Sequence, residues 1–400
     1  MRHTGIAMLF GASAALAAMG PLAAQQKAAL SKPLAETTES FTQITSIREL
    51  PSGKVLVADA RDKIVQLVDM ASGSMTKVGR EGSGPGEYAL PMSLIALPDG
   101  STLLHDLLNN RFLTLGTDGK PGGFLEMPRP PAAAADGAGP MRMMRMTNIR
   151  GSDSRGRLYF AGSPFSPTGG TMDSIPLLRW DRVKPTFDTV GYLRLPAGSV
   201  SRTEPARGQM MVRMGNNVRF TPTETWGVAG DGTVARVFPE PYRVAWVTGP
   251  GQVALGPVVP YSPIKVTAAD KKEVMDAQRR NPGVTMIVGG PGGGPRPGAA
   301  PPTPQLPEPE FAETKPPYDA GPGFAGGAVL VAPEGEVWVL RTRPAGDKIP
   351  TYDVFDRAGA LIKKVSLNPS SRVVGFGKGV VYVARSDEDD LVYLQRFARP

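Results

Sequence analysis

The chain has 400 residues, of which 41% are hydrophobic, 20% charged and 7% aromatic, the composition of an ordinary globular protein. Its 48 glycines and 41 prolines predict frequent turns and few long helices, and so favour an all-β fold. The absence of cysteine and the presence of two histidines exclude zinc fingers, thiol nucleophiles and multi-histidine metal centres. The formal net charge of +8 is spread along the chain without an interleaved aromatic ladder, which argues against nucleic-acid binding.

The first two dozen residues have the pattern of a secretory signal peptide. Arg2 precedes an apolar, alanine-rich run from Gly5 to about Met19, and small residues follow up to Ala24. The run is shorter than the roughly 20 residues that cross a bilayer. We predict cleavage after Ala24 and a periplasmic or secreted protein that does not span the membrane. An uncleaved membrane anchor is the alternative.

One pattern then recurs six times: a short apolar strand, a turn ending in glycine, and a second strand of alternating β-branched or aromatic residues. The turn glycines are Gly53, Gly100, Gly156, Gly232, Gly335 and Gly379. A third strand is expected at 64–68, 111–115, 177–180, 242–247, 352–355 and 391–397. This order of strands and turns is typical of the blades of a β-propeller.

The chain ends three strands into the sixth unit, so we expect residues 34–44 to supply the missing strand and close a six-bladed ring. An all-β sandwich is the alternative. Large side chains at equivalent alternating positions should pack between adjacent sheets. These are Val57, Trp246, Trp338, Phe355, Tyr382 and Tyr393.

Two long gaps between turn glycines, after Gly156 and after Gly232, hold insertions. In the second, Thr267 and Asp270 have the spacing of a helix N-terminus, and helix-forming residues continue to about Arg280. Residues 289–309 are rich in glycine and proline and predict a disordered arm. The predicted fold is all-β: one six-bladed β-propeller domain over 25–400, with one short helix and a Gly/Pro-rich insertion.

The second unit carries the clearest family resemblance. Residues 97–119 resemble an NHL repeat, in which an aspartate is followed by asparagine, arginine and an apolar residue at fixed spacing. Here those residues are Asp106, Asn109, Arg111 and Phe112. The first unit matches in part, with Asp59, Asp62 and Lys63, and residues 79–91 look like the connection between blades in such proteins.

The sequence therefore resembles bacterial extracytoplasmic six-bladed β-propellers of the NHL-like and TolB-like kind. The resemblance covers roughly residues 40–400 in weak repeats. It implies a fold and a compartment, because this broad group includes binding proteins, lactonases and lyases.

In a propeller, the connections between blades and between second and third strands emerge on one face, where function usually resides. Two of these loops, around 141–146 and 202–219, concentrate arginine and methionine. We predict a non-enzymatic protein, monomeric, that binds a small anionic ligand, a peptide or an envelope protein. The candidate ligand-binding residues are Arg80, Glu81, Asp106, Asn109, Arg111, Arg145, Arg213 and Arg219.

Three other interpretations of these residues stay open. The loop charges could simply be solvated, with the methionines filling the core. The methionines at 141–146 could bind copper(I) through their thioethers. His105 could act as a general base, although burial as a structural histidine is the simpler interpretation.

The alternative function is a metal-dependent lactonase-like or lyase-like enzyme. Such propellers hold calcium or another divalent cation in the central channel through oxygen ligands, and convergence of three or more donors would favour it. The donors available are Glu81, Asp106, Asn109, Asn110, Asn148, Asn216 and Asn217.

Overall fold

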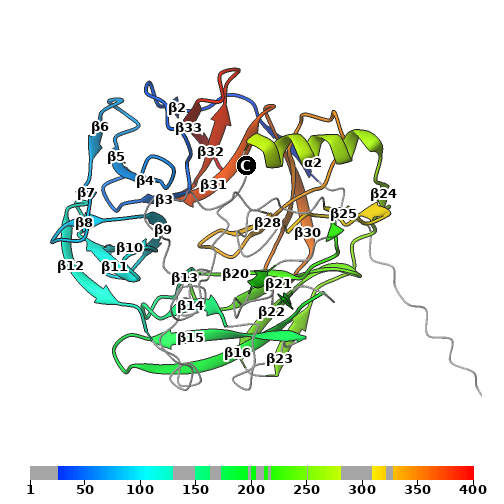
Figure 1. The fold of residues 1–400 in the computed structure, drawn as a ribbon, viewed down its shortest axis with the longest axis horizontal. Helices are drawn as coiled ribbons and strands as arrows, with labels where there is room; N and C mark the ends of the chain where they lie inside the picture. The colour runs from blue at the N-terminus through cyan, green and yellow to red at the C-terminus, as the bar shows by residue number, and fades with distance from the viewer. Residues whose placement is uncertain are drawn as a thin grey trace, which may run out of the picture.

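The computed structural model describes residues 26–128, 149–162, 173–196, 200–203, 211–214, 218–249, 251–280, 309–320 and 328–400. Within these ranges, six mainly antiparallel sheets of four or five strands are arranged around a common axis (Figure 1). The chain is a six-bladed β-propeller, as predicted. In the same ranges no helix is both long and apolar enough to span a membrane. The predicted signal peptide and the 289–308 part of the predicted arm lie outside the described residues.

Each blade begins with its innermost strand and proceeds outward. Blade 1 contains β3 (Ser46–Glu49), β4 (Val55–Asp59), β5 (Ile64–Val68) and β6 (Met75–Lys77). Blade 2 contains β9 (Pro91–Ala96), β10 (Thr102–Asp106), β11 (Arg111–Leu115) and β12 (Pro121–Glu126). Blade 3 contains β13 (Ile149–Ser152), β14 (Leu158–Ala161), β15 (Ser174–Asp181) and β16 (Thr186–Arg194).

The second half of the ring has the same plan. Blade 4 contains β20 (Thr225–Val228), β21 (Val234–Pro239), β22 (Tyr242–Gly249) and β23 (Gln252–Leu255). Blade 5 contains β27 (Val329–Val331), β28 (Val337–Leu340), β29 (Thr351–Phe355) and β30 (Leu361–Leu367). Blade 6 contains β31 (Ser371–Gly377), β32 (Val380–Ser386), β33 (Val392–Ala398) and, from the start of the chain, β2 (Ala35–Glu36).

The six turn glycines occupy the positions that the repeat predicted. Their φ angles lie between 68° at Gly379 and 97° at Gly335, a region that other residues rarely enter. Each therefore ends the tight turn that joins the first and second strands of its blade. These turns, together with those between third and fourth strands, form one end of the propeller, which we call the turn face. The opposite end, with the longer connections, is the loop face.

The start of the chain closes the ring as predicted and adds a strand that was not predicted. Strand β2 pairs antiparallel with β33 of blade 6, and an isolated bridge joins Phe41 to Val392. Before it, β1 (Gln26–Leu30) lies parallel to β30 on the outer edge of blade 5. Residues 26–36 therefore cover the edges of two neighbouring blades.

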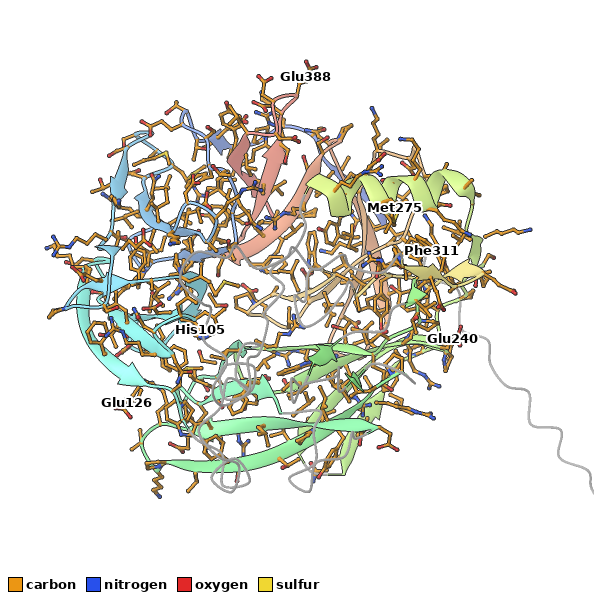
Figure 2. All side chains as sticks on the ribbon, viewed as in Figure 1. His105, Glu126, Glu240, Met275, Phe311 and Glu388 are labelled. Atoms are coloured by element: carbon orange, nitrogen blue, oxygen red, sulfur yellow. The ribbon has the colours of Figure 1, made fainter. Side chains whose placement is uncertain are left out.

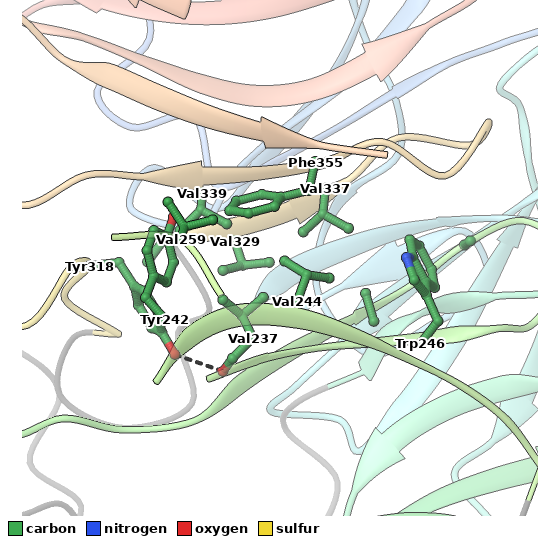
Figure 3. Close-up of a cluster of buried hydrophobic side chains, with 13 residues drawn as sticks. Val237, Tyr242, Val244, Trp246, Val259, Tyr318, Val329, Val337, Val339 and Phe355 are labelled. Carbon is green, nitrogen blue, oxygen red and sulfur yellow. Dashed lines mark hydrogen bonds between the residues drawn. The ribbon is translucent and has the colours of Figure 1, made fainter. Parts of the chain in front are cut away.

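The core lies between adjacent blades. Between blades 4 and 5, Tyr242 and Phe355 meet edge to face with ring centroids 5.6 Å apart, and Tyr318 donates a hydrogen bond to the carbonyl of Val237 (Figure 3). Five of the six predicted core side chains are buried. They are Val57, Trp246, Trp338, Phe355 and Tyr382. The prediction was wrong for Tyr393, which is half-buried and lies under the guanidinium of Arg385.

The insertions meet each other on the loop face. Strand β19 (Val218–Arg219), from the connection between blades 3 and 4, pairs with β25 (Glu310–Phe311) from the next connection. Within that second connection, β24 (Ile264–Lys265) pairs with β26 (Thr314–Lys315). The remaining short pairs are β7 (Arg80–Glu81) with β8 (Glu87–Tyr88), and β17 (Val200–Thr203) with β18 (Met211–Met214).

The predicted helix is α2 (Ala268–Arg280), and its N-terminus has the predicted cap. Thr267 donates from its backbone N and its Oγ1 to Asp270 Oδ2, at 2.8 and 2.7 Å, and Asp270 N donates back to Thr267 Oγ1 at 3.3 Å. The other oxygen of Asp270 lies 2.5 Å from Lys315 Nζ, and both side chains are buried. This ion pair joins the helix to β26.

Candidate functional site

Asp106, the last residue of β10, joins the connection between blades 1 and 2 to blade 2. Its Oδ1 accepts hydrogen bonds from the backbone N–H groups of Ala89 and Leu90 at 3.1 and 3.0 Å, and its Oδ2 accepts one from Asn109 Nδ2 at 2.6 Å. Arg111 Nε lies 3.7 Å from the same oxygen. The side chain of Asp106 is fully buried. The NHL-like spacing of these residues thus produces a hydrogen-bonded anchor for the loop.

Blade 1 repeats this anchor. Asp59, the last residue of β4, accepts hydrogen bonds from the backbone N–H groups of Gln43 at 2.8 Å and Arg61 at 2.9 Å. Lys63 and Asn110, four residues after the two aspartates, both have positive φ, at 54° and 50°. The loops of blades 1 and 2 therefore share one backbone plan, although their sequences match only in part.

The charged side chains of the same connection are paired with one another. Arg80 Nε lies 2.7 Å from Glu87 Oε1, and Lys63 Nζ lies 2.5 Å from Glu81 Oε1. Arg111 donates to the carbonyl of Glu87 and lies over the ring of Phe124. Arg80, Glu81, Asp106, Asn109 and Arg111 are thus gathered on blades 1 and 2, in a surface whose charges largely compensate.

The other three predicted residues belong to the connections after blades 2 and 3. Arg219, in β19, lies with its Nη2 3.5 Å from Asp319 Oδ2. Arg213 is in the middle of β18, where the backbone is described and the side chain is not. Arg145 lies outside the described residues, as do the methionines weighed as copper ligands. The structure therefore does not bring all eight predicted residues into one described cluster.

Around the axis, the innermost strands carry arginines that the sequence analysis missed. Arg150 is the second residue of β13 and Arg372 the second of β31, so both lie near the loop face, on opposite blades of the ring. Arg48 and Glu49 lie at the other end, at the close of β3, where Glu49 accepts hydrogen bonds from Lys378 N and Tyr382 Oη. In the half of each described innermost strand that lies nearer the loop face, the charged side chains are therefore arginines, and none is acidic.

Neither of the two loop-face arginines has a carboxylate partner among the described residues. Arg372 donates to the backbone carbonyl of Ile44, just before β3 of blade 1, and its side chain is exposed. Burial lowers the pKa of Arg150 to about 10, and its guanidinium lies 5.8 Å from the ring of Trp226 in blade 4. A sequence signal did exist: Arg48, Arg150 and Arg372 each lie within the apolar run of a first strand, shortly before its turn glycine.

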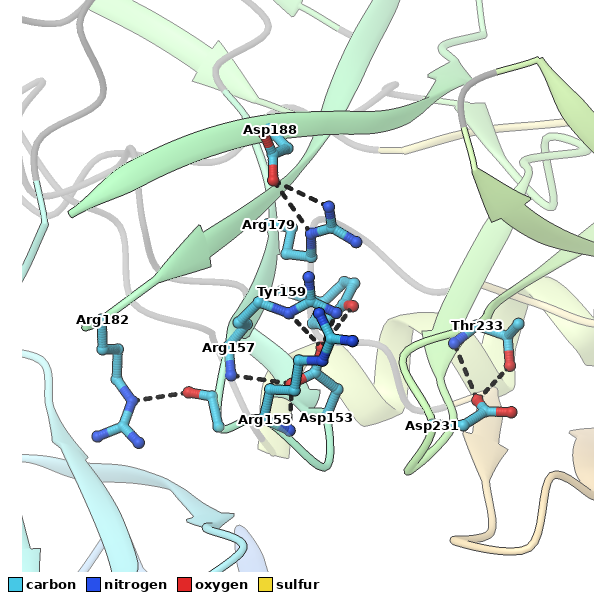
Figure 4. A network of polar contacts seen from close by, with 10 residues as sticks. Asp153, Arg155, Arg157, Tyr159, Arg179, Arg182, Asp188, Asp231 and Thr233 are labelled. Atoms are coloured by element: carbon cyan, nitrogen blue, oxygen red, sulfur yellow. Dashed lines mark hydrogen bonds and ion pairs between the residues drawn. The ribbon is translucent and has the colours of Figure 1, made fainter. Parts of the chain in front are cut away.

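Elsewhere, several half-buried arginines are paired with carboxylates. Between blades 4 and 5, Arg341 Nη1 lies 2.7 Å from Asp353 Oδ2, which also accepts a hydrogen bond from Tyr242 Oη at 3.0 Å. At the turn face of blade 3, Arg157 lies 2.7 Å from Asp153 (Figure 4). Such pairs keep buried carboxylates and guanidinium groups satisfied within the fold.

His105 lies in the interior of blade 2, whereas Glu126 and Glu388 project from the outside of the molecule (Figure 2). The ring of His105 packs against Phe112 with centroids 5.6 Å apart, and His105 Nδ1 is buried without a hydrogen-bond partner among the described residues. Burial lowers the pKa of His105 to about 4, with Asp106 opposing the shift. At neutral pH the side chain is an uncharged part of the interface between blades 2 and 3.

The oxygen donors considered for a divalent cation do not converge within the described residues. Asp106 and Asn109 are hydrogen-bonded to each other, and Glu81 is paired with Lys63. Asn148, Asn216 and Asn217 lie outside the described ranges. In the part of the chain that is described, no group of three or more histidine, aspartate or glutamate side chains could hold a metal ion.

Several solved structures align with the chain at low sequence identity. A putative exported protein from Bacteroides fragilis aligns with a TM-score of 0.48 at 12% identity, over 92% of this chain and 95% of that one. Virginiamycin B lyase from Staphylococcus aureus gives 0.41 at 11%, over 92% and 99%. Regucalcin, a calcium-binding protein from Agrobacterium tumefaciens, gives 0.40 at 12%, over 93% and 97%.

No protein-family model and no curated protein sequence matches the chain. At these identities and TM-scores the solved structures carry no argument about ligand or activity. The chain is identified by its architecture, a six-bladed β-propeller closed by its N-terminal strand.

Proposed function

We propose that this protein is an exported, non-catalytic β-propeller that binds a small anionic molecule, or an anionic group of a peptide or envelope protein, at its loop face. One observation carries the proposal: Arg150 and Arg372 lie on opposite innermost strands near the loop face, and neither has a carboxylate partner among the described residues. The signal-peptide pattern of residues 1–24 supports export.

The residues proposed from the sequence fall into two groups along the chain. Arg80, Glu81, Asp106, Asn109 and Arg111 form a hydrogen-bonded rim on blades 1 and 2. In the proposal Arg145, Arg213 and Arg219 add positive charge from the later connections. A rigid rim with an electropositive centre would attract an anion over a distance of about 10 Å at ordinary ionic strength.

The test is isothermal titration of the purified protein with a set of small anions: phosphate, sulfate, citrate and succinate, each against an uncharged analogue. We expect at least one anion to bind with 1:1 stoichiometry and to bind less tightly as sodium chloride is raised. Binding of an uncharged analogue with equal affinity, or no binding of any anion, would contradict the proposal. Turnover of lactone substrates on addition of calcium would favour the enzyme instead.

A further inference from the structure

Arg150 occupies a bulge in the innermost strand of blade 3. Ile149 pairs with Phe160 and Gly151 pairs with Tyr159, which leaves Arg150 as an extra residue without a partner on β14. A bulge turns the side chain of its extra residue away from the regular alternation of the strand. The side chain of Arg150 therefore need not follow the alternation by which neighbouring residues of a regular strand point to opposite faces of the sheet.

The guanidinium of Arg150 is partly buried and has no polar partner. Its Nε is buried without a hydrogen bond, and no ion pair or hydrogen bond involves the group among the described residues. Because Nε is its only polar atom that is both fully buried and unpartnered, Nη1 and Nη2 keep some exposure to solvent. The ring of Trp226 at 5.8 Å offers the cation a weak interaction only.

Three other half-buried arginines of the fold do have a carboxylate partner. Arg157, Arg236 and Arg341 are buried to a similar degree, and each lies within 2.7 Å of a carboxylate oxygen. Partial burial of an arginine without a carboxylate is unfavourable, because desolvation of the charge is not compensated. An oxyanion from outside the chain would supply the missing partner.

We propose that Arg150 anchors the ligand, and that the group it binds is a single oxyanion, a carboxylate or a phosphate. This inference rests on the proposed function and makes it more specific. The planar guanidinium can donate two parallel hydrogen bonds to such a group through Nη1 and Nη2. The guanidinium of Arg150 lies over the ring of Trp226. Arg372, on the opposite blade, adds positive charge near the same end of the axis.

The binding experiment compares three variants with the wild type, using sodium phosphate and sodium succinate as probes at constant ionic strength. Arg150→Gln removes the charge, Arg150→Lys keeps the charge without the planar fork, and Arg357→Gln removes an exposed turn-face charge that is already paired with Asp231. We expect Arg150→Gln to weaken binding about 10- to 100-fold and Arg150→Lys to weaken it less, while Arg357→Gln changes it little.

The pattern of outcomes separates this inference from the proposed function. Binding to wild type by phosphate alone, or by succinate alone, identifies the oxyanion. Equal binding by wild type and Arg150→Gln would overturn the role of Arg150 and leave the proposed function standing. If neither probe nor any other anion bound the wild type, the proposed function itself would fail, and this inference with it.

A second measurement, the melting temperature of the ligand-free protein, can be made even for a variant that binds no anion. Arg150→Met should leave the melting temperature of the ligand-free protein unchanged or raise it, because it removes an uncompensated charge. Arg341→Met should lower the melting temperature by several degrees, because it leaves Asp353 buried without its cation. An equal loss in both variants would show that Arg150 is structural and would contradict the proposal.

Discussion

His105 gives the fold a specific sensitivity to acid. Its pKa is about 4 in the folded protein because burial disfavours the charged ring, against 6.5 for an exposed histidine. The unfolded chain therefore binds a proton that the folded protein does not accept as the pH falls from 6.5 towards 4. The stabilisation is complete above pH 6.5 and is lost through that window.

We predict that His105→Leu removes this part of the pH dependence. Between pH 7 and pH 4.5 the wild type should lose about 2 kcal/mol more in its free energy of unfolding than the variant, from the pKa difference alone. Urea denaturation at the two pH values measures the difference, and carboxylates that titrate in both proteins cancel. Parallel losses in wild type and variant would show that His105 is charged or exposed at pH 4.5.

Two turn glycines with almost the same backbone angle face different surroundings. Gly53 has a φ of 82° and open space where a Cβ would stand, whereas at Gly232, with a φ of 89°, a Cβ would lie 2.5 Å from Tyr159 Oη. Gly53→Ala should lower the free energy of unfolding by about 1 kcal/mol through backbone strain. Gly232→Ala should cost more, because Tyr159 and its hydrogen bond to Asp153 must move. Chemical denaturation of both variants tests this, and equal losses would argue against the contact.

At the scale of elements, helix α2 depends on one buried ion pair. Burial alone would raise the pKa of Asp270, but hydrogen bonds from Lys315 and Thr267 lower it to about 2, so the carboxylate stays charged. Asp270→Asn leaves Lys315 buried without its counter-charge, which costs about 3 kcal/mol. We predict that hydrogen exchange in residues 268–280 accelerates about 100-fold while the blades keep their protection.

Asp276→Asn is the matched control, because Asp276 pairs with Lys272 and Arg279 on the exposed side of the same helix. It should leave exchange in the helix nearly unchanged. Fast exchange in both variants, or in neither, would contradict a specific role for the ion pair between Asp270 and Lys315.

The elements that could be predicted from the sequence are those whose signals are local. A turn that needs positive φ requires glycine, so Gly53 and its five counterparts mark the blades directly. The helix cap formed by Thr267 and Asp270 likewise depends on only four consecutive residues. Strand β1 and the pair β19–β25 could not be predicted, because each joins segments far apart in the chain through very short stretches.

In the candidate site, too, the features with local sequence signals could be predicted and those that depend on distant segments could not. The NHL-like spacing identified the loop around Asp106, but not that its polar atoms are engaged in holding the connection between blades. Arg150 escaped notice because its orientation depends on a bulge, a property of strand pairing that a single sequence does not display. Pairing of charges across blades, as in Arg357 of blade 5 with Asp231 of blade 4, can be recognised only once the ring is assembled.

At the scale of the whole molecule, the two faces of the ring differ in how their charged groups are partnered. The turn face is held by glycine turns and paired charges such as Asp153 with Arg157. The loop face carries the insertions and, near the axis, two arginines without carboxylate partners among the described residues. Six blades bring these arginines to opposite sides of one axis although they are far apart in sequence. The architecture thereby combines two basic side chains that no single repeat contains.

The most direct test of this account is a crystal structure of the protein soaked with selenate, with the anion located by anomalous scattering. We predict a peak at the loop-face end of the axis, within hydrogen-bond distance of Nη1 or Nη2 of Arg150, and its disappearance in Arg150→Gln. A peak confined to outer-surface lysines, with the end of the axis empty in crystals of a protein that binds the anion in solution, would contradict the account.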